Sequence, residues 1–181
     1  MADEQALLAA LADIQLRGAI GEVSLPAAVA HADQFVAALP PSAQRLADLG
    51  SGGGLPGLVI AVRRPTLAIT LVERRRSRAD LLQRAVRALR LEQVTVFGGD
   101  VRDLAAAQAH SFDVVTARSF AAPAITARWA GELQLVGGVL IVSEPPEPDD
   151  GRWPESVLAT AGLTNLGPMG GIRRFQRVSN P

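Results

Sequence analysis

A glycine-rich run that follows a short apolar segment constrains this chain more than any other feature. Residues 45–49 read Arg-Leu-Ala-Asp-Leu, glycines dominate residues 50–54, and a second apolar stretch covers residues 55–62. This order predicts a strand, a tight turn and a helix, because glycine lets the backbone approach a ligand with no Cβ in the way. The helix would offer unpaired N–H groups and the positive end of its dipole to an anion. The run therefore predicts a site for a nucleotide-like cofactor.

The spacing of these glycines fits two kinds of cofactor. Gly52-x-Gly54-x-x-Gly57 satisfies the spacing of dinucleotide-binding loops, in which the backbone packs against a pyrophosphate. Asp48-x-Gly50-x-Gly52-x-Gly54 satisfies the spacing of S-adenosylmethionine-dependent methyltransferases. We favour the second interpretation, because Asp48 would repel a pyrophosphate and attract the ammonium group of the methionine moiety. A glycine turn that holds no ligand is the remaining alternative.

Apolar strands and amphipathic helices alternate along the rest of the chain. Such alternation implies right-handed crossovers and a mostly parallel sheet with helices on both faces. Two final extended segments predict an antiparallel edge hairpin, an ending that matches the sheet of class I methyltransferases. We expect one domain over residues 1–181, with N-terminal helices in 1–44 and an α/β, Rossmann-like cofactor-binding core in 45–181. The predicted strands are 46–49, 68–72, 94–97, 112–116 and 139–142, then the hairpin segments 164–166 and 172–178, and the predicted helices are 3–15, 26–39, 77–91, 123–135 and 153–161, with a loop at 145–150.

Acidic residues follow the second and third predicted strands. Glu73 ends the second strand, where a carboxylate can accept both ribose hydroxyls of an adenosine, and an acid paired with nearby arginines is the alternative. Asp100 and Val101 follow the third strand, where a carboxylate can bind the exocyclic amine of adenine and a backbone N–H can reach a ring nitrogen. A turn or helix cap is the alternative for Asp100, because aspartate is a good N-cap.

Arg118 follows the fourth predicted strand. Strand carboxyl ends line the ligand crevice in open α/β sheets, so Arg118 is a candidate to contact the cofactor and to position the substrate. A surface arginine without a role is the alternative. The complete set of predicted cofactor-binding residues is Asp48, Gly50, Ser51, Gly52, Gly53, Gly54, Glu73, Asp100, Val101 and Arg118.

Arginines gather between residues 63 and 90 and again near the end of the chain. The densest part is Arg74-Arg75-Arg76-x-Arg78, directly after Glu73 and at the mouth of the predicted site. Guanidinium groups suit bidentate contact with phosphate, so these four residues are predicted to bind RNA. A helix with a solvated basic face is the alternative, and the formal net charge of zero weakens a general nucleic-acid interpretation.

Composition excludes several classes of protein. The chain has no cysteine, so it forms no disulfide and no thiolate metal site, and we expect no bound metal. Its 48% hydrophobic content argues against disorder. It opens with Met-Ala-Asp-Glu, which is unlike a signal peptide, and no apolar stretch approaches a membrane span. We therefore expect a soluble, cytoplasmic protein without a membrane partner.

These motifs together resemble the bacterial 16S rRNA guanine-N7 methyltransferases, the glucose-inhibited-division protein B family. The run Asp48-Leu-Gly-Ser-Gly-Gly-Gly-Leu-Pro-Gly57 is similar to the family signature. Leu71-Val-Glu73 and Phe112-Asp-Val-Val-Thr-Ala-Arg118-Ser-Phe-Ala121 resemble its second and fourth strand motifs. The resemblance covers about residues 45–142 and implies a class I methyltransferase fold, S-adenosylmethionine as the cofactor and rRNA or the small ribosomal subunit as the partner.

The chain departs from the family pattern mainly where the family contacts its substrate. An Asn-Leu-Thr element precedes the family core, where this chain reads Leu16-Arg-Gly-Ala-Ile20, and a His-x-x-Asp-Ser helix corresponds to His31-Ala-Asp-Gln34. Strand five of the family leads to Lys-Gly, and here it leads to Ser143-Glu144-Pro145. Asp100-Val-Arg-Asp103 has an arginine where the family tends to have glutamate. These departures are compatible with a divergent member.

The residue types also narrow the chemistry. Methylation of a pyrimidine C5 generally uses a cysteine nucleophile, which this chain lacks, and the segment 118–121 differs from the Asn/Asp-Pro-Pro-aromatic turn of exocyclic amine methyltransferases. Guanine N7 has an in-plane lone pair, so catalysis there can rest on alignment with the sulfonium methyl group. We therefore predict an rRNA guanine-N7 methyltransferase. The alternatives are a paralogue that binds the cofactor without rRNA activity and a nicotinamide-dependent oxidoreductase that uses the dinucleotide spacing.

Overall fold

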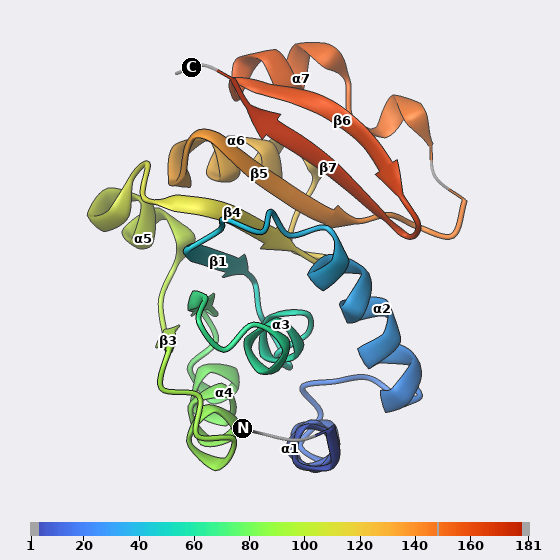
Figure 1. The fold of residues 1–181 in the computed structure, drawn as a ribbon, viewed down its shortest axis with the longest axis vertical. Helices are drawn as coiled ribbons and strands as arrows, with labels where there is room; N and C mark the ends of the chain where they lie inside the picture. The colour runs from blue at the N-terminus through green and yellow to red at the C-terminus, as the bar shows by residue number, and fades with distance from the viewer. Residues whose placement is uncertain (1–3, 148, 179–181) are drawn as a thin grey trace.

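Seven strands form one sheet in the computed structural model, which describes residues 4–147 and 149–178. They are β1 (Arg45–Leu49), β2 (Ala68–Val72), β3 (Val94–Phe97), β4 (Phe112–Ala117), β5 (Gln134–Ser143), β6 (Leu163–Met169) and β7 (Ile172–Arg177). Their order is β3-β2-β1-β4-β5-β7-β6, with β1 to β5 parallel and β7 antiparallel to both β5 and β6 (Figure 1). The structure confirms the predicted α/β fold of the class I methyltransferases.

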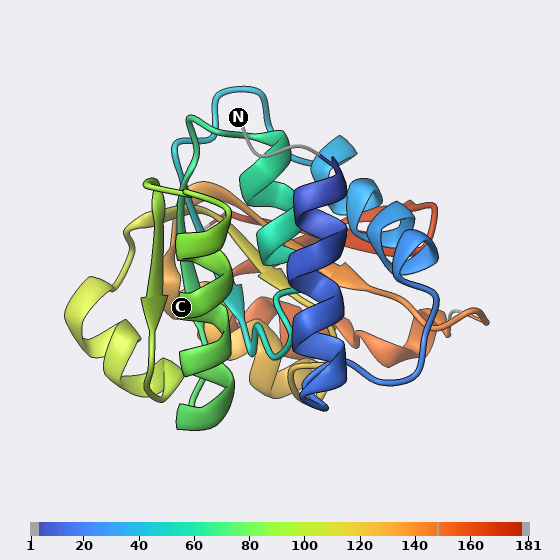
Figure 2. The ribbon, with the colours of Figure 1, turned by 90° about the horizontal axis from the view of Figure 1, so that it is seen from below.

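Helices cover both faces of the sheet. One face carries α2 (Leu25–Ala37), α3 (Gly57–Arg63) and α4 (Arg76–Ala88), and α1 (Glu4–Leu16) packs against all three, as the view from below shows (Figure 2). The other face carries α5 (Val101–Gln108), α6 (Pro123–Leu133) and α7 (Glu155–Thr160), with a 3-10 helix, η1 (Asp150–Arg152), ahead of α7. This layering follows from parallel strands, which need a crossover between each pair.

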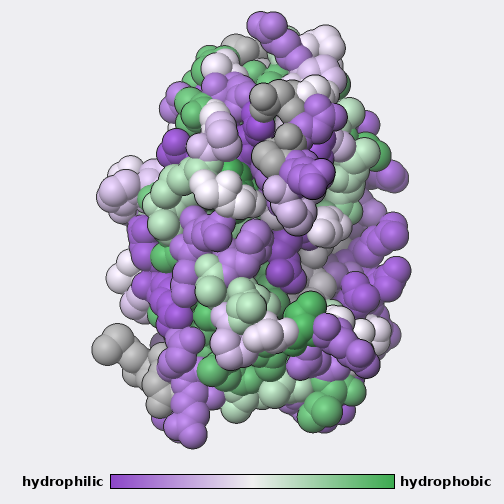
Figure 3. All heavy atoms as spheres, turned by 90° about the vertical axis from the view of Figure 1, so that its right-hand side faces the viewer, coloured by the Kyte–Doolittle hydropathy of each residue, from purple (hydrophilic) through white to green (hydrophobic). Residues whose placement is uncertain are grey.

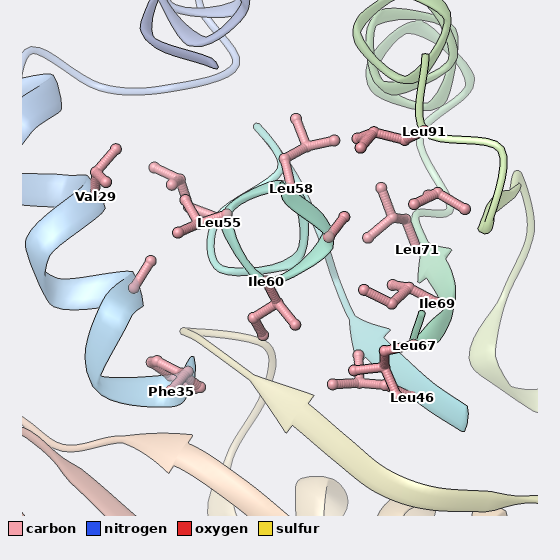
Figure 4. Packing of buried hydrophobic residues seen from close by; sticks show 14 of the residues in the cluster. Val29, Phe35, Leu46, Leu55, Leu58, Ile60, Leu67, Ile69, Leu71 and Leu91 are labelled. Carbon is pink, nitrogen blue, oxygen red and sulfur yellow. The ribbon is translucent and has the colours of Figure 1, made fainter. Parts of the chain in front are cut away.

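Two hydrophobic cores lie on the two faces, and β1 divides its side chains between them. Leu46 belongs to the core around α3, together with Phe35 of α2, and Ala47 belongs to the core beneath α5 and α6. Figure 4 shows this first core, in which Leu58 projects from α3 and Leu46 and Leu71 come from the neighbouring strands β1 and β2. Because side chains alternate along a strand, Asp48 lies on the same face as Leu46, towards α3.

The C-terminal hairpin is anchored in the second core and at the start of β5. Phe175 is fully buried, and its ring centroid lies 4.7 Å from that of Trp153. Arg177, 1% exposed, donates a hydrogen bond to the backbone oxygen of Gln134 and lies 2.6 Å from Nδ1 of His110. The predicted antiparallel hairpin is therefore present, with β6 longer than expected.

Two elements differ from the sequence expectation. The helix α5 was not predicted, because its buried stripe is limited to three residues of an alanine-rich segment, Val101, Leu104 and Ala105. The strand β5 begins at Gln134, directly after α6, although the sequence predicted a helix to 135 and a strand from 139. A register shift between Phe112 and Val114 of β4 accommodates this early start. Asp3, Pro148 and the two ends of the predicted 1–181 domain lie outside the described residues.

The surface that carries α2 is mostly hydrophilic. Figure 3 shows this face, on which hydrophobic side chains gather toward the lower end of the view, where α1 lies. Leu16 at the end of α1 is 87% exposed, and Val23 of the following connection is 54% exposed. Among the helices formed by residues 4–147 and 149–178, none is long and apolar enough to cross a membrane.

Candidate cofactor site

The glycine-rich segment turns at the carboxyl end of β1 and is held there by backbone contacts. Its positive φ angles, 64°, 54° and 89°, occur at Gly50, Gly52 and Gly54. The Ser51 N–H donates to the backbone oxygen of Val72 over 2.9 Å, which ties the loop to the end of β2. A Cβ on Gly53 would lie 2.9 Å from the backbone oxygen of Ala19, so the connection between α1 and α2 rests directly on the loop. Glycine is required here both by conformation and by close approach.

Asp48 lies beneath the loop as a buried carboxylate, 1% exposed. Its Oδ1 accepts a hydrogen bond of 2.7 Å from Thr116 Oγ1, a neighbour on β4. Its Oδ2 lies near the backbone N–H of Gly57 but makes no hydrogen bond of normal geometry. Burial raises the pKa of Asp48 to about 6, although the hydrogen bond from Thr116 and the positive charge of Arg118 act in the opposite direction. A buried carboxylate oxygen that lacks a partner is suited to a cationic ligand.

The start of α3 faces this carboxylate. The sequence predicted that the helix after the glycines would offer its N–H groups to an anionic ligand, but α3 begins only at Gly57. A Cβ on Gly57 would lie 2.7 Å from Asp48 Oδ2, so the first residue of the helix packs against the protein's own carboxyl group. The helix start therefore supports Asp48 and does not form a separate anion site.

Glu73 holds two segments of backbone at the end of β2. Its Oε2 accepts a hydrogen bond of 3.0 Å from the N–H of Gly52, and its Oε1 accepts one of 2.8 Å from the N–H of Arg75. The residue is 5% exposed and was predicted to accept ribose hydroxyls. A carboxylate has about four lone-pair sites, so two remain for hydroxyl donors after these bonds. The predicted alternative, a side-chain ion pair with the neighbouring arginines, is not what the described residues show.

A cavity of about 470 Å³ opens beside Glu73, at the carboxyl ends of β2 and β3, and is named here the β2–β3 cavity. Asp100 and Val101 line it, and Asp100 also caps α5 by accepting a 3.0 Å hydrogen bond from the N–H of Arg102. The helix-cap interpretation of Asp100 is thus confirmed, and its contact with adenine stays a prediction. The apolar wall of the cavity consists of Phe120, Ile125 and Trp129, and its arginines are Arg74, Arg75, Arg78 and Arg102.

A second cavity, of about 380 Å³, lies at the carboxyl ends of β4 and β5 and is named here the β4–β5 cavity. Arg118 lines it together with His31 of α2 and Glu144, which follows β5. The predicted loop residues that line it are Gly50, Ser51, Gly52 and Gly53. The residues that the two cavities share are Gly50, Arg78 and Ser119. The two cavities therefore meet at the glycine loop and can accept one ligand with two chemically different halves.

Electrostatics in the β4–β5 cavity centre on Arg118. Burial lowers the pKa of Arg118, and the Asp48 carboxylate acts against this shift. Burial also lowers the pKa of His31, and the positive charge of Arg118 adds to the effect. The cavity thus holds the Arg118 guanidinium and the His31 imidazole, and the charge of the buried Asp48 carboxylate acts on Arg118.

The predicted site residues occupy different depths. Asp48 and Gly54 line neither cavity and support the loop from below, and a Cβ on Gly54 would lie 2.7 Å from Leu58 Cγ. Arg74 and Arg75 are exposed at the rim of the β2–β3 cavity, and Arg76 lies outside both cavities. No group of three or more His, Asp and Glu side chains within the described ranges is arranged to hold a metal ion.

Sequence reasoning did not identify three of the residues around the loop. Ala19 precedes the first strand by a long interval, so its contact with the loop follows from the packing of α1 and not from a local motif. His31 had no role assigned. Glu144 could have been found by the rule that led to Arg118, because it also follows a parallel strand at its carboxyl end.

Fold and site together define a class I methyltransferase-type α/β protein with a nucleotide-cofactor site. The chain belongs to the GidB family, described as rRNA small subunit methyltransferase G, whose sequence model matches residues 31–144. The family resemblance inferred from the motifs is thereby confirmed. The matched region includes the glycine loop, the ends of the strands that line the two cavities, and Arg118.

Relatives with curated names agree with this assignment. The chain is 41% identical over 108 residues to a ribosomal RNA small subunit methyltransferase G of Acidiphilium cryptum, a match that covers 60% of this chain and 48% of the relative. It is 39% identical over 116 residues to the protein of that name from Neisseria meningitidis, covering 63% of this chain and 55% of the relative. The chain therefore spans about half the length of the curated relatives it matches.

Solved structures share the fold at lower sequence identity. Cofactor-bound Rv0187 from MTB superposes with a TM-score of 0.68 at 21% identity, covering 98% of this chain and 92% of that one. The O-methyltransferase TomG from Streptomyces achromogenes, solved in complex with SAM, gives a TM-score of 0.66 at 19% identity and covers 99% and 92%. At this identity the likeness concerns the fold.

Proposed function

We propose that this protein is an S-adenosylmethionine-dependent methyltransferase that methylates N7 of a guanine in small-subunit rRNA. The observation that carries the proposal is the GidB family match over residues 31–144, which includes the site built around the glycine loop. The relatives named as small-subunit rRNA methyltransferases support the substrate class. A substrate of this kind would place the protein in the cytoplasm.

The cavities suit the two halves of this cofactor. In the β2–β3 cavity, Glu73 would bind the ribose hydroxyls, Asp100 the adenine amine, and Val101 would contact the ring from the same side. In the β4–β5 cavity, the backbone from Gly50 to Gly53 would line the space that holds the amino-acid half of the cofactor. The buried carboxylate of Asp48 lies beneath this loop and lines neither cavity, so its negative charge would attract a ligand ammonium group through the loop. S-adenosylmethionine has both an adenosine and an amino acid, so its chemistry matches this donor and acceptor set.

The transfer itself requires position more than proton chemistry. When bound, S-adenosylmethionine supplies a methyl group on a positively charged sulfur, and the N7 lone pair forms the new bond while the pair of the broken C–S bond stays on sulfur. No side chain has to deprotonate N7 first. Arg118, which follows β4 and lines the β4–β5 cavity, would orient the base. Alignment of reacting atoms of this kind can supply a large part of a rate enhancement.

The exposed arginines next to the site suit an RNA backbone. Arg74, Arg75 and Arg76 lie between β2 and the first turn of α4, and all three are exposed. Guanidinium groups bind phosphate oxygens in bidentate fashion. We propose that these arginines contact phosphates of the rRNA while the target base enters the β4–β5 cavity. Arg78 of the same cluster is half-buried and lines both cavities.

One alternative function has a specific observation in its favour. Glu144 is an acidic residue that lines the β4–β5 cavity, where an RNA-binding site would usually carry basic residues, and its side chain, 2% exposed, lies 3.5 Å from Nε of Arg173. A paralogue that binds the cofactor and has lost transfer to rRNA would be compatible with this feature. The oxidoreductase alternative has less support, because an antiparallel β7 stands between β5 and β6, unlike the parallel order of dinucleotide-binding domains.

Titration calorimetry with S-adenosylhomocysteine, with NAD as the control ligand, tests the cofactor assignment. The proposal predicts saturable binding of S-adenosylhomocysteine and no detectable heat from NAD. Binding of NAD alone would instead support the dinucleotide interpretation of Gly52-x-Gly54-x-x-Gly57. Cofactor binding without methyl transfer to small-subunit rRNA would favour the paralogue.

A further inference from the structure

We infer that Arg78 binds the carboxylate of the amino-acid half of the cofactor and is not one of the RNA-phosphate contacts. This inference rests on the proposed function and identifies a further cofactor-binding residue of the same site. Arg78 is one of three residues that line both cavities, and the other two, Gly50 and Ser119, have no charge. A ligand that spans the two cavities must pass this guanidinium.

The depth of Arg78 separates it from its neighbours in the arginine cluster. Arg74, Arg75 and Arg76 are exposed, whereas Arg78 is half-buried. Its Nη1 would lie 3.9 Å from a Cβ placed on Gly52, so the guanidinium stands beside the glycine loop and next to the second of its glycines. An arginine that only attracts the RNA backbone can do so from an exposed position on the surface. The half-buried position of Arg78 between the two cavities therefore favours contact with a bound ligand.

The guanidinium of Arg78 is also available for a ligand. Within residues 4–147 and 149–178 its side chain forms no ion pair and no hydrogen bond, although its backbone N–H donates to Arg75 O. Glu73, which lines the β2–β3 cavity together with Arg78, is already engaged by the N–H groups of Gly52 and Arg75. A carboxylate matches the planar fork of an arginine, which can form two parallel hydrogen bonds with it.

The arrangement of charge gives the amino-acid group a defined orientation. Asp48 lies buried beneath the loop with an unpaired oxygen, and Arg78 lies beside Gly52 of the loop, where both cavities reach it. An α-amino acid has an ammonium and a carboxylate on the same carbon. Asp48 would attract the first group and Arg78 the second, so the two residues select a zwitterion and fix which way it points.

Binding of two ligands that differ in this one group tests the assignment. S-adenosylhomocysteine has the carboxylate, and its decarboxylated analogue S-adenosyl-3-thiopropylamine keeps the adenosine and the amine. Wild type should bind the first more tightly, by about 10- to 100-fold if the charged hydrogen bonds are formed. Arg78→Gln should remove most of this preference by weakening S-adenosylhomocysteine and leaving the analogue unchanged. Arg78→Lys should restore part of it.

Arg84→Gln is the matched control, because Arg84 is exposed on the same helix and lines neither cavity. It should leave both affinities as in wild type. Equal loss for both ligands in Arg78→Gln, or no loss for either, would overturn the assignment. So would a variant that binds S-adenosylhomocysteine normally and rRNA weakly, since Arg78 would then be a phosphate contact. If wild type bound neither ligand, the proposed function itself would fail, which distinguishes the two cases.

Discussion

The residue Asp48 should make cofactor binding depend on pH. Burial raises its pKa to about 6, so its charge is lost as the pH falls through that value. If Asp48 binds the cofactor's ammonium group, the affinity for S-adenosylhomocysteine should fall below about pH 6, approaching tenfold per pH unit. Asp48→Asn should bind weakly at every pH. Calorimetry over a pH series checks this, with His31→Gln as the control that should keep the wild-type profile; an unchanged profile in Asp48→Asn would contradict the role.

The same group makes a prediction about stability. A carboxyl whose pKa rises from 3.8 in the unfolded chain to about 6 in the fold favours the folded state while it is protonated. Its contribution is therefore fully present below about pH 4 and is lost as the pH rises through about 6, by up to about 3 kcal/mol. Urea titrations at several pH values should show this slope in wild type, and it should be absent from Asp48→Asn. Parallel curves for the two proteins would mean that Asp48 does not titrate in this range.

Gly57 tests the packing beneath the loop. A Cβ there would lie 2.7 Å from Asp48 Oδ2 and would also overlap the side chain of Leu71. Gly57→Ala should therefore lower the free energy of unfolding by about 1–3 kcal/mol, as overpacking in a core does. Gly98→Ala is the control, because a Cβ there would make an ordinary contact of 3.5 Å with Ala79. Equal stability of the two variants in urea titrations would show that α3 does not press on Asp48.

At this scale the sequence predicted which residues gather at the site better than it predicted what each one contacts. Strand ends and glycines identify Asp48, Glu73 and Arg118, because they depend on local order along the chain. The backbone partners of Glu73 and the burial of Asp48 arise from the loop conformation, which has no sequence pattern of its own. His31 comes to the cavity through the packing of α2.

At the scale of elements, the β6–β7 hairpin depends on Phe175. This ring is fully buried against Trp153 and the second core. Phe175→Ala should cost about 3–5 kcal/mol of stability, because a large cavity would remain between the sheet and α7. Leu166 of β6 is 42% exposed, so Leu166→Ala is the control and should be nearly neutral. Urea denaturation measures both, and a small loss in Phe175→Ala would mean that the hairpin is not part of the cooperative fold.

The segment between β2 and α4 makes a prediction about salt. If Arg74, Arg75 and Arg76 contact phosphates, replacing all three by glutamine should weaken rRNA binding and reduce the slope of log K against log salt by about two. The affinity for S-adenosylhomocysteine should change little, because the side chain of Arg76 lies outside both cavities and the other two are at a rim. Filter binding at several salt concentrations measures the slope. An unchanged slope would place the RNA elsewhere on the protein.

Helices and strands with a regular spacing of apolar residues could be predicted from the sequence. A short helix and a strand with a register shift could not. The parallel strands β1 to β4 begin within one residue of their predicted positions because their apolar runs are bounded by turn residues. The helix α5 has only a short row of buried apolar side chains, so its sequence resembles that of a loop. The early start of β5 depends on the register shift opposite β4, which is a property of the paired strands and not of either sequence alone.

For the whole molecule, the site joins segments that are distant in the sequence, so ligand binding should stabilise the fold. The two cavities draw on α2, the glycine loop and the ends of β2, β3, β4 and β5. S-adenosylhomocysteine at about a hundred times its Kd should add about 2.7 kcal/mol to the free energy of unfolding and raise the melting temperature. NAD at the same concentration should not. Differential scanning calorimetry distinguishes the two, and stabilisation by NAD alone would contradict the cofactor assignment.

Methyl transfer to guanine N7 of small-subunit rRNA is the activity that we propose for this protein. The most direct measurement incubates the protein with methyl-labelled S-adenosylmethionine and small ribosomal subunits from a methyltransferase-deficient strain. Borohydride and aniline cleavage, which is selective for 7-methylguanosine, then locates the modification. The account predicts label in the rRNA and cleavage at a single guanine, with neither in reactions that contain Arg118→Ala. Cofactor binding without any label in the rRNA, or label at an atom other than N7, would contradict it.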